Sequence, residues 1–197
     1  MFPSKTLVQY HAKLVSVKKD QMLICEGEPA TDYLQVESGS VKMFIVSPEG
    51  QEFIQGIFGA GESFGEPALI GKFPYPGNVV AIEPSRVWRL PVDYFFQMLK
   101  DNFDLHMKMD EVLCQRLRYK SMLLSEISSH EPEHRIITLL KHYKTKHGSA
   151  ADTRVTIPYT RQQLADMTGL RVETVIRAVK KMEKEKKLIL EDHKIRI

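Results

Sequence analysis

The residues best suited to recognise another molecule lie in the run TGLRVETVIRAVKKME, residues 168–183. Read at the period of a helix, its outward-facing side chains are Val172, Glu173, Ile176, Arg177 and Lys180. Arginine can donate two hydrogen bonds to guanine, glutamate can accept one from cytosine N4, and an aliphatic side chain can contact a thymine methyl group. We therefore predict that Val172, Glu173, Ile176 and Arg177 read DNA bases.

Basic residues around this run could hold the phosphates of a DNA backbone. The residues predicted to do so are Arg161, Arg171, Lys180, Lys181 and Lys184. Phosphate contacts give affinity without sequence preference, and the alternative for each residue is a solvated surface charge. The positive charge of the chain is concentrated here, because residues 131–197 carry 15 Lys and Arg against 9 Asp and Glu, whereas residues 1–130 carry 13 against 16.

The elements that would position this face form a helix-turn-helix pattern. Thr160 followed by Gln163 is a capping box, so a helix is expected to begin at Arg161 and run to about Met167. Gly169 can take the left-handed conformation that a tight turn requires, and a second helix follows from Val172. The final run KKLILEDHKIRI then reads as two short strands with a turn near residues 192–193, a wing beside the second helix.

Upstream, residues 12–92 have the period of short strands punctuated by glycines, which indicates a sandwich or barrel. Gly50 in SPEG is expected to supply the positive φ of a hairpin turn. From about Val92 a helical period continues for about 35 residues. Pro132 suits the first turn of a further helix over 131–146, after a hinge near 128–132. Residues 147–152 read as a loop, and VTIP as a short strand.

The long helical stretch carries an apolar stripe at alternating steps of three and four residues. Its predicted dimer-forming members are Met109, Leu113, Leu117, Leu124 and Ile127, with Lys120 among them. A stripe of this length favours a parallel coiled coil with a second copy. The alternative is that the helix packs only on its own sandwich.

Other classes of protein find little support. No apolar run reaches the roughly 18–20 residues of a membrane helix, and no signal peptide is evident, so we expect a cytoplasmic protein. Cys25 and Cys114 are too few for an iron–sulfur cluster and are expected to be small buried residues. A cupin-type enzyme would need histidine ligands, and residues 12–105 contain none. We predict no catalysis and no metal site.

A glycine-punctuated β-roll, a long helix, a hinge and a winged helix-turn-helix resemble the organisation of the CRP/FNR family of bacterial transcription regulators. TRQQLADMTGLRVETVIRAVKKMEKEKKLI resembles its DNA-binding signature, and FGEPALIG, 64–71, resembles its effector-pocket signature. The resemblance implies an α+β fold with a cyclic-nucleotide-binding-like β-roll of the double-stranded β-helix or jelly-roll type (1–92), a dimerisation helix and hinge (93–130) and a winged helix-turn-helix (131–197).

The resemblance also implies a function. Family members are homodimers that bind a palindromic operator, and RNA polymerase is a further expected partner if the protein is an activator. Glu173 and Arg177 stand where the family reads the core of a TTGA-like or GTGA-like half-site. Val172 stands where the cAMP-responsive branch has another base-reading arginine, so the helix resembles the FNR branch and TTGA-like half-sites are expected.

The effector pocket implied by the resemblance comprises Gly65, Glu66, Pro76, Gly77, Asn78, Lys120 and Ser121. In cAMP-binding members an Arg–Ser or Arg–Thr pair holds the cyclic phosphate, and here Pro76 and Gly77 take those places. An effector other than cAMP, or none, is therefore predicted. The cysteine cluster of oxygen-sensing members is absent, so no iron–sulfur cluster is expected, and haem is not favoured because residues 12–105 contain no histidine. Two alternatives stay open, a cAMP-responsive regulator and a cyclic-nucleotide-binding-like module that regulates an enzyme or channel.

Overall fold

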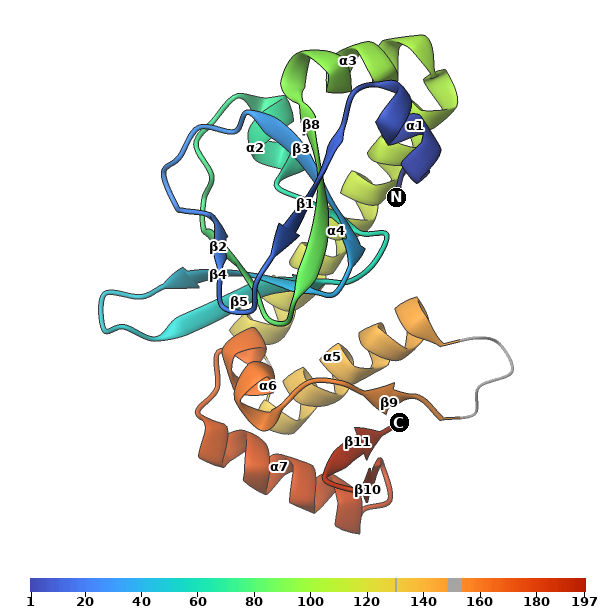
Figure 1. Cartoon of the computed structure of the whole chain (residues 1–197). Helices are drawn as coiled ribbons and strands as arrows, with labels where there is room; N and C mark the ends of the chain where they lie inside the picture. The colour runs from blue at the N-terminus through green and yellow to red at the C-terminus, as the bar shows by residue number, and fades with distance from the viewer. Residues whose placement is uncertain (130, 149–153) are drawn as a thin grey trace. The chain divides into compact units, whose positions relative to one another are not determined.

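The computed structural model describes residues 1–129, 131–148 and 154–197, without the side chains of Ile127 and Ser129 (Figure 1). The chain divides into two compact units, Met1–Arg116 and Leu117–Ile197. Residue 130 of the predicted hinge and residues 149–152 of the predicted loop lie outside the described residues. Within the described residues, no helix is both long and apolar enough to cross a membrane.

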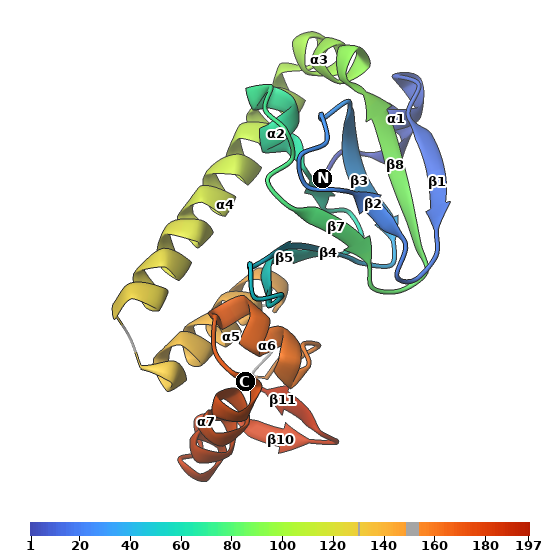
Figure 2. The same ribbon diagram turned by 90° about the vertical axis from the view of Figure 1, so that its left-hand side faces the viewer.

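Two antiparallel four-stranded sheets form the β-roll of the first unit (Figure 2). The strands of one sheet, in spatial order, are β1 (Lys13–Val17), β8 (Ser85–Pro91), β3 (Asp32–Ser38) and β6 (Ser63–Phe64). Those of the other are β2 (Met22–Ile24), β7 (Asn78–Ala81), β4 (Val41–Val46) and β5 (Glu52–Phe58). Inward side chains such as Val36, Val41, Phe64 and Val79 form the core between the strands. The predicted β-roll is confirmed.

The hairpin between β4 and β5 shows how local chemistry sets the register of the second sheet. Gly50 has a φ of 82°, as expected for the turn SPEG. Its amide donates to the carbonyl of Ser47 at 2.9 Å, and the amide of Ser47 donates to the carbonyl of Gln51 at 2.8 Å. The turn brings β4 and β5 into antiparallel register from Val46 opposite Glu52 onward.

A second core in this unit lies against the helices α1 (Ser4–Gln9), α3 (Val92–Asp101) and the first part of α4 (Phe103–Ser129). The rings of Tyr33 and Phe95 stack there with centroids 5.0 Å apart. The short helix α2 (Glu66–Gly71) follows β6 and contributes Leu69 to this core.

The helical stretch predicted from Val92 is not continuous. Asn102 has φ −132° and ψ 88°, outside the helical region, and separates α3 from α4. Its side-chain amide donates to the carbonyl of Met98 at 2.9 Å. Asparagine forms such local bonds readily, so it favours helix ends over helix interiors. The periodicity of the apolar residues survives this break, which is why the sequence alone did not reveal it.

The predicted dimer stripe on α4 also needs correction. Met109 is only 1% exposed and packs in the second core of its own unit, and Leu113 is partly buried against the same core. Leu117 and Leu124 are 68% and 70% exposed. The first half of the stripe therefore serves the chain's own fold, because α4 lies along the roll there. Leu117 and Leu124 remain as the exposed apolar members among the described side chains, with the exposed Lys120 between them.

Both cysteines are exposed, contrary to the expectation of small buried residues. Cys114 lies on α4 seven residues after Met107 and three before Leu117, both of which are at least half exposed. At these spacings Met107, Cys114, Leu117, Ser121 and Leu124 share one side of the helix, which we call the outer α4 face.

After the end of α4, the described residues of the second unit form the helices α5, α6 and α7 and a small sheet. Its elements after the end of α4 are α5 (Pro132–His147), β9 (Thr156–Ile157), α6 (Arg161–Thr168), α7 (Val172–Lys184), β10 (Ile189–Glu191) and β11 (Lys194–Arg196). Pro132 begins α5, as predicted, because its fixed φ and missing amide hydrogen suit a first turn. Ile136, Leu139 and Leu140 of α5 are buried, whereas Ile137 is only partly so. The predicted strands near the C-terminus pair antiparallel through a turn at Asp192 and His193.

Candidate nucleic-acid interface and effector site

Reciprocal hydrogen bonds at the start of α6 set the geometry of the helix-turn-helix. The Oγ1 atom of Thr160 accepts from the amide of Gln163 at 3.1 Å, and Oε1 of Gln163 accepts from the amide of Thr160 at 2.9 Å. Gly169 ends α6 with a φ of 66°. The predicted capping box and glycine turn are confirmed, and α7 begins at Val172, where the sequence placed it.

The inner face of α7 is anchored in the core of the second unit. Val175, Ala178, Val179 and Met182 are all at most 6% exposed. Because these residues alternate at three and four positions, the rest of the helix is turned outward. The anchoring holds the outer face in one orientation, which a surface that reads bases requires.

The outer face of α7 carries the predicted base-reading residues. Glu173 and Arg177 are exposed, Ile176 is 39% exposed, and Val172 is partly buried at the first turn. An exposed isoleucine between a carboxylate and a guanidinium gives this face an apolar contact surface beside a hydrogen-bond acceptor and a donor. Side chains with these groups can distinguish the base pairs by the edges that they present in the major groove.

Most of the predicted phosphate contacts are also turned outward. Arg171, Lys180 and Lys184 are exposed, and Arg161 is partly buried at the start of α6. Burial lowers the pKa of Arg161, but an arginine stays charged at neutral pH in either case. Lys181 differs from the others, because its Nζ donates to Oε1 of Glu133 on α5 at 2.7 Å. This carboxylate raises the pKa of Lys181 and holds its ammonium group toward α5.

The wing adds residues that the sequence analysis did not assign to the interface. Asp192 and His193, at the tip of the β10–β11 hairpin, line an open hollow of about 570 Å³ together with Arg161, Ile176 and Lys180. The wing tip therefore lies beside the outer face of α7. The turn residues between the two predicted strands were the available signal, but nothing local indicates which helix a hairpin tip approaches.

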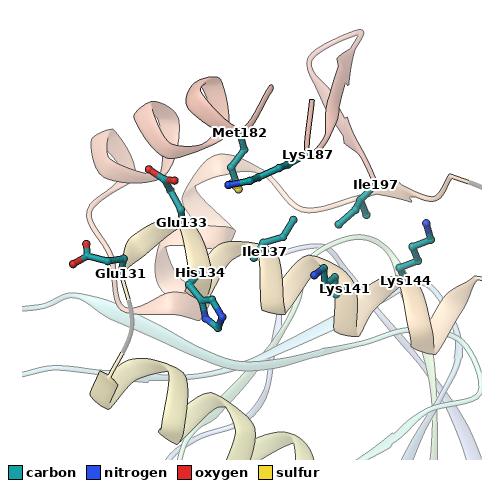
Figure 3. Close-up of a pocket in the computed structure, with 9 residues that line it drawn as sticks. All are labelled: Glu131, Glu133, His134, Ile137, Lys141, Lys144, Met182, Lys187 and Ile197. Atoms are coloured by element: carbon teal, nitrogen blue, oxygen red, sulfur yellow. The ribbon is translucent and has the colours of Figure 1, made fainter. Parts of the chain in front are cut away.

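A second hollow in this unit, of about 580 Å³, lies between α5, the end of α7 and the C-terminal residue (Figure 3). Ile137, Met182 and Ile197 supply its apolar part. Its rim mixes lysines with Glu131 and Glu133, so it does not present one sign of charge to a ligand. None of the predicted site residues lies in it.

In the first unit, the predicted effector residues Gly65 and Glu66 lie at the junction of β6 and α2. Gly65 has a φ of 81°. A Cβ atom there would lie 2.9 Å from Cε1 of Tyr75, so this ring packs directly against the glycine. Tyr75 is 5% exposed, and burial raises its pKa to about 12. Glu66 is completely buried, and its Oε2 atom lies 2.6 Å from Nη1 of Arg116 on α4.

The segment from Tyr75 to Asn78, where cAMP-binding members hold the cyclic phosphate, is in contact with other segments of the first unit. The amide of Tyr75 donates to the carbonyl of Glu28, and Asn78 Oδ1 accepts from the amide of Glu26 at 3.0 Å. A Cβ at Gly77 would lie 2.9 Å from the carbonyl oxygen of Phe44, and Pro76 is exposed and has no amide hydrogen. These residues offer no cationic donor, so they do not fit the phosphate of a cyclic nucleotide.

Lys120 and Ser121 belong to the second unit, where both side chains are exposed. Gly65, Glu66, Pro76, Gly77 and Asn78 of the predicted pocket all lie in the first unit. Arg116, four residues before Lys120, contacts Glu66 of the predicted pocket. Among the described residues, no group of three or more His, Cys, Asp or Glu side chains is arranged to hold a metal ion.

Comparison with known proteins finds a different family model in each of the two units. Residues 14–102 match the model of the cyclic nucleotide-binding domain, and residues 134–197 match that of the Crp-like helix-turn-helix domain. A β-roll of the first kind joined through a long helix to a domain of the second kind defines a transcription regulator of the helix-turn-helix class. The chain belongs to the CRP/FNR family.

Both an anaerobic regulator and a cAMP-activated regulator are similar to the chain. It is 24% identical over 172 residues to the anaerobic regulatory protein of Pasteurella multocida, covering 85% of this chain and 62% of that protein. It is 25% identical over 169 residues to the CRP-like cAMP-activated global transcriptional regulator of Mycobacterium tuberculosis, covering 84% and 75%. The chain thus spans less than two thirds of the first of these relatives.

Solved structures show the same fold. A CooA mutant from Carboxydothermus hydrogenoformans aligns with a TM-score of 0.83 at 15% identity, covering all of this chain and 86% of that one. FixK2 from Bradyrhizobium japonicum aligns with a TM-score of 0.77 at 22% identity, covering 93% and 91%. At these identities the likeness concerns the fold and not the ligand.

Proposed function

We propose that this chain is a homodimeric transcription regulator that binds a palindromic DNA operator with TTGA-like half-sites. The observation that carries the proposal is the outer face of α7, where Glu173, Ile176 and Arg177 are exposed on a helix whose inner face is fixed in the core. The membership in the CRP/FNR family supports the same reading. The cytoplasm is the compartment in which such a protein would meet its operator.

In this proposal, α7 enters the major groove. Arg177 donates two hydrogen bonds to a guanine, Glu173 accepts one from a cytosine, and Ile176 contacts a thymine methyl group. Arg161, Arg171, Lys180 and Lys184 hold phosphates and fix the register of the helix. Because Lys181 is paired with Glu133, we assign it a smaller share in DNA binding than the sequence alone indicated.

The proposed dimer forms through the outer α4 face. Leu117 and Leu124 would be unusual as solvated residues at 68% and 70% exposure, and seven-residue spacing is the repeat of a two-stranded coiled coil. Two copies joined in parallel would place two α7 helices on one side of the dimer. A separation of about 34 Å, one helical turn, would let both enter successive major grooves. RNA polymerase would be the further partner if the protein activates transcription.

The proposed regulator does not depend on cyclic AMP. The support for this is the segment of Tyr75 to Asn78, which lacks a cationic donor for a cyclic phosphate, and the buried pairing of Glu66 with Arg116. An effector of other chemistry, or none, would then control DNA binding. An effector can shift the dimer between states only by its difference in affinity for them.

Selection of binding sites from random duplex DNA tests the proposal, using the purified chain without ligand, with cAMP and with haem. We expect the ligand-free protein to enrich a palindrome with TTGA-like half-sites. Enrichment that requires cAMP would contradict the assignment of the effector. A monomeric protein that enriches no sequence under any of these conditions would sink the proposal as a whole.

A further inference from the structure

The exposed stripe on α4 extends beyond the outer α4 face toward the start of the helix. Phe103 is 70% exposed and lies two seven-residue steps before Leu117, so it occupies the same position of the repeat. The position midway between them is held by Asp110. Phe103 and the residues of the outer α4 face are uncharged, so Asp110 is the charged member of this stripe. A carboxylate at such a position is costly to bury between two helices.

Asp110 has further charged side chains around it on α4. Nε2 of His106 lies 4.0 Å from Oδ2 of Asp110, and these side chains are 49% and 52% exposed. Asp104, Lys108 and Glu111 are also exposed. With a neutral histidine, three carboxylates stand against one lysine here, which leaves two negative charges per copy. Protonation of His106 leaves one.

The elements packed behind this part of α4 carry their charges on its other side. The helices α1 and α3 share a core with α4 through the buried Met109. Their nearest charged residues include Lys5, Lys100 and Asp101, and Asp101 accepts hydrogen bonds from neighbouring side chains. Burial, followed by the charge of Lys108, lowers the pKa of the Met1 amino group, so Lys108 acts toward that group. The carboxylates of the stripe therefore depend chiefly on His106 for a nearby positive charge.

A second copy brings the same charges to the other side of the proposed seam. In a parallel coiled coil the two Asp110 residues face each other, and His106 lies beside the fifth residue along on the other helix, which is Glu111. Asp110 and Glu111 of the two copies thus bring four carboxylates together around two histidines. Carboxylates at such distances repel one another unless a cation lies between them. Histidine is the side chain that gains and loses its charge between pH 5 and 8.

We infer that protonation of His106 controls dimer assembly, with each protonated His106 placed between Asp110 of its own helix and Glu111 of the other copy. The inference rests on the parallel dimer of the proposed function and adds how that dimer is regulated. The added carboxylates make His106 bind a proton more tightly in the dimer than in the monomer. By linkage, the dimer becomes stronger as the pH falls through the titration range of histidine, and weaker as it rises.

Sedimentation of the full chain tests the inference. From about pH 8.0 to about pH 6.0 in about 50 mM salt, we expect the dissociation constant of the dimer to fall at least fivefold. In about 0.5 M salt the change should shrink to less than twofold, because salt screens exposed charges. These positions are exposed, so substitutions there should leave the fold intact, and circular dichroism checks this.

Variants assign the response to its residues. His106→Gln should keep the weaker dissociation constant at both pH values. Asp110→Asn/Glu111→Gln should dimerise at pH 8.0 about as strongly as the wild type does at about pH 6.0, because the repulsion is absent. His11→Asn is the matched control and should keep the full response, since His11 is an exposed histidine of the same unit and asparagine tolerates its positive φ.

A mixing experiment tests the geometry. When differently tagged chains are mixed at about pH 8.0, Asp110→Lys should pair with the wild type at least threefold more often than random mixing gives, because unlike charges then face each other. Lys108→Glu changes a charge away from the seam and should mix at random. Random mixing of Asp110→Lys would contradict the placement of Asp110 in the seam.

The possible failures are distinguishable. A dimer with the same dissociation constant at both pH values would overturn the inference and leave the dimer of the proposed function in place. A response that persists in His106→Gln would also overturn it, because another group would then be its source. A chain that stays monomeric at both pH values would overturn the inference together with the proposed dimer.

Discussion

Among the individual residues, exposure separates those that can contact DNA from those that hold the fold. Arg177 and Lys184 are both exposed cations on α7, but they lie at different places on the helix. Arg177 stands on the face with Glu173 and Ile176, whereas Lys184 is the last residue of the helix. A cation in the last turn also interacts favourably with the helix dipole. The two residues should therefore differ in what they contribute to binding.

Arg177→Ala should cost about 1–3 kcal/mol of specific binding and relax the preference at one base position, because a bidentate contact to a base is lost. Lys184→Ala should weaken binding to all sequences alike and reduce the slope of log affinity against log salt by about 1. Both are measured by titrating the selected operator and a scrambled duplex at several salt concentrations. Unchanged operator preference in Arg177→Ala would show that the outer face of α7 has been assigned wrongly.

Among the helices of the second unit, α6 begins with side-chain hydrogen bonds to its first turn. The capping box at the start of α6 satisfies two backbone amide donors at once, those of Thr160 and Gln163. The helix is only eight residues long, so it cannot be stable by its own propensity. Its position against α7 therefore relies on the cap, on Gly169 and on the buried side chains between the helices.

Thr160→Ala should lower the free energy of unfolding of the second unit by about 1 kcal/mol, since the amide of Gln163 loses its partner. Thr160→Ser keeps the hydroxyl oxygen and should cost much less. Urea unfolding followed by circular dichroism measures both. Equal losses in the two variants would mean that the methyl group of Thr160, and not its hydrogen bond, stabilises the start of α6.

Packing between α4 and α5 introduces a dependence on pH. The rings of Tyr119 and His142 stack with centroids 4.2 Å apart. Burial, followed by the nearby charges of Lys146, His147 and Arg118, lowers the pKa of His142 below its usual 6.5. The unfolded chain therefore binds a proton at His142 more readily than the folded chain does. The contribution of neutral His142 to the free energy of unfolding is complete above pH 6.5, and it is lost as the pH falls below 6.5 toward the lower pKa of the folded state.

His142→Phe should keep the stacking and remove this part of the pH dependence. The urea midpoint of the wild type should fall between about pH 7.5 and about pH 5.5, and that of the variant should fall less. His193→Asn is the control, because His193 is an exposed histidine whose charge is not among those that lower the pKa of His142, and asparagine tolerates its positive φ. The same decrease in the wild type and in His142→Phe would rule out His142 as the source.

For the molecule as a whole, the proposed homodimer requires a surface through which two copies can meet. The buried side of α4 is occupied by the chain's own core through Met109, so a partner helix is expected on the exposed side, where the outer α4 face offers apolar residues. This face presents Met107, Leu117 and Leu124 with Cys114 between them. In a parallel two-fold pair, each residue of the seam lies near the same residue of the other copy.

The native Cys114 reports on this arrangement. A short bismaleimide should cross-link the dimer through Cys114, giving a band of twice the mass on a denaturing gel. Cys25→Ser should leave the cross-link in place, and Cys114→Ser should abolish it. Leu117→Glu should weaken the cross-link and shift the protein toward the monomer in sedimentation, because like charges would then face each other. A stable dimer that is cross-linked through Cys25 alone would contradict the proposed seam.

Much of the second unit was predictable because its signals are local. The capping box, the glycine turn and the buried side of α7 each depend on residues within about one or two helical turns of one another. The short strands of the roll and the turn at Gly50 were predictable for the same reason. Hydrogen bonds and backbone conformations that involve only residues close in sequence are formed as soon as the helix, turn or strand itself is formed.

The sequence by itself thus determined the order of the elements, the two kinds of domain and the outward face of α7. Only the tertiary structure decided that Met109 belongs to the chain's own core, that Lys181 is paired with Glu133, and that Glu66 is bound by Arg116. The physical reason is distance along the chain. Glu133 and Lys181 are 48 residues apart, and Glu66 and Arg116 are 50 apart, so neither pairing leaves a periodic signal. Such contacts depend on which surfaces the completed fold brings together.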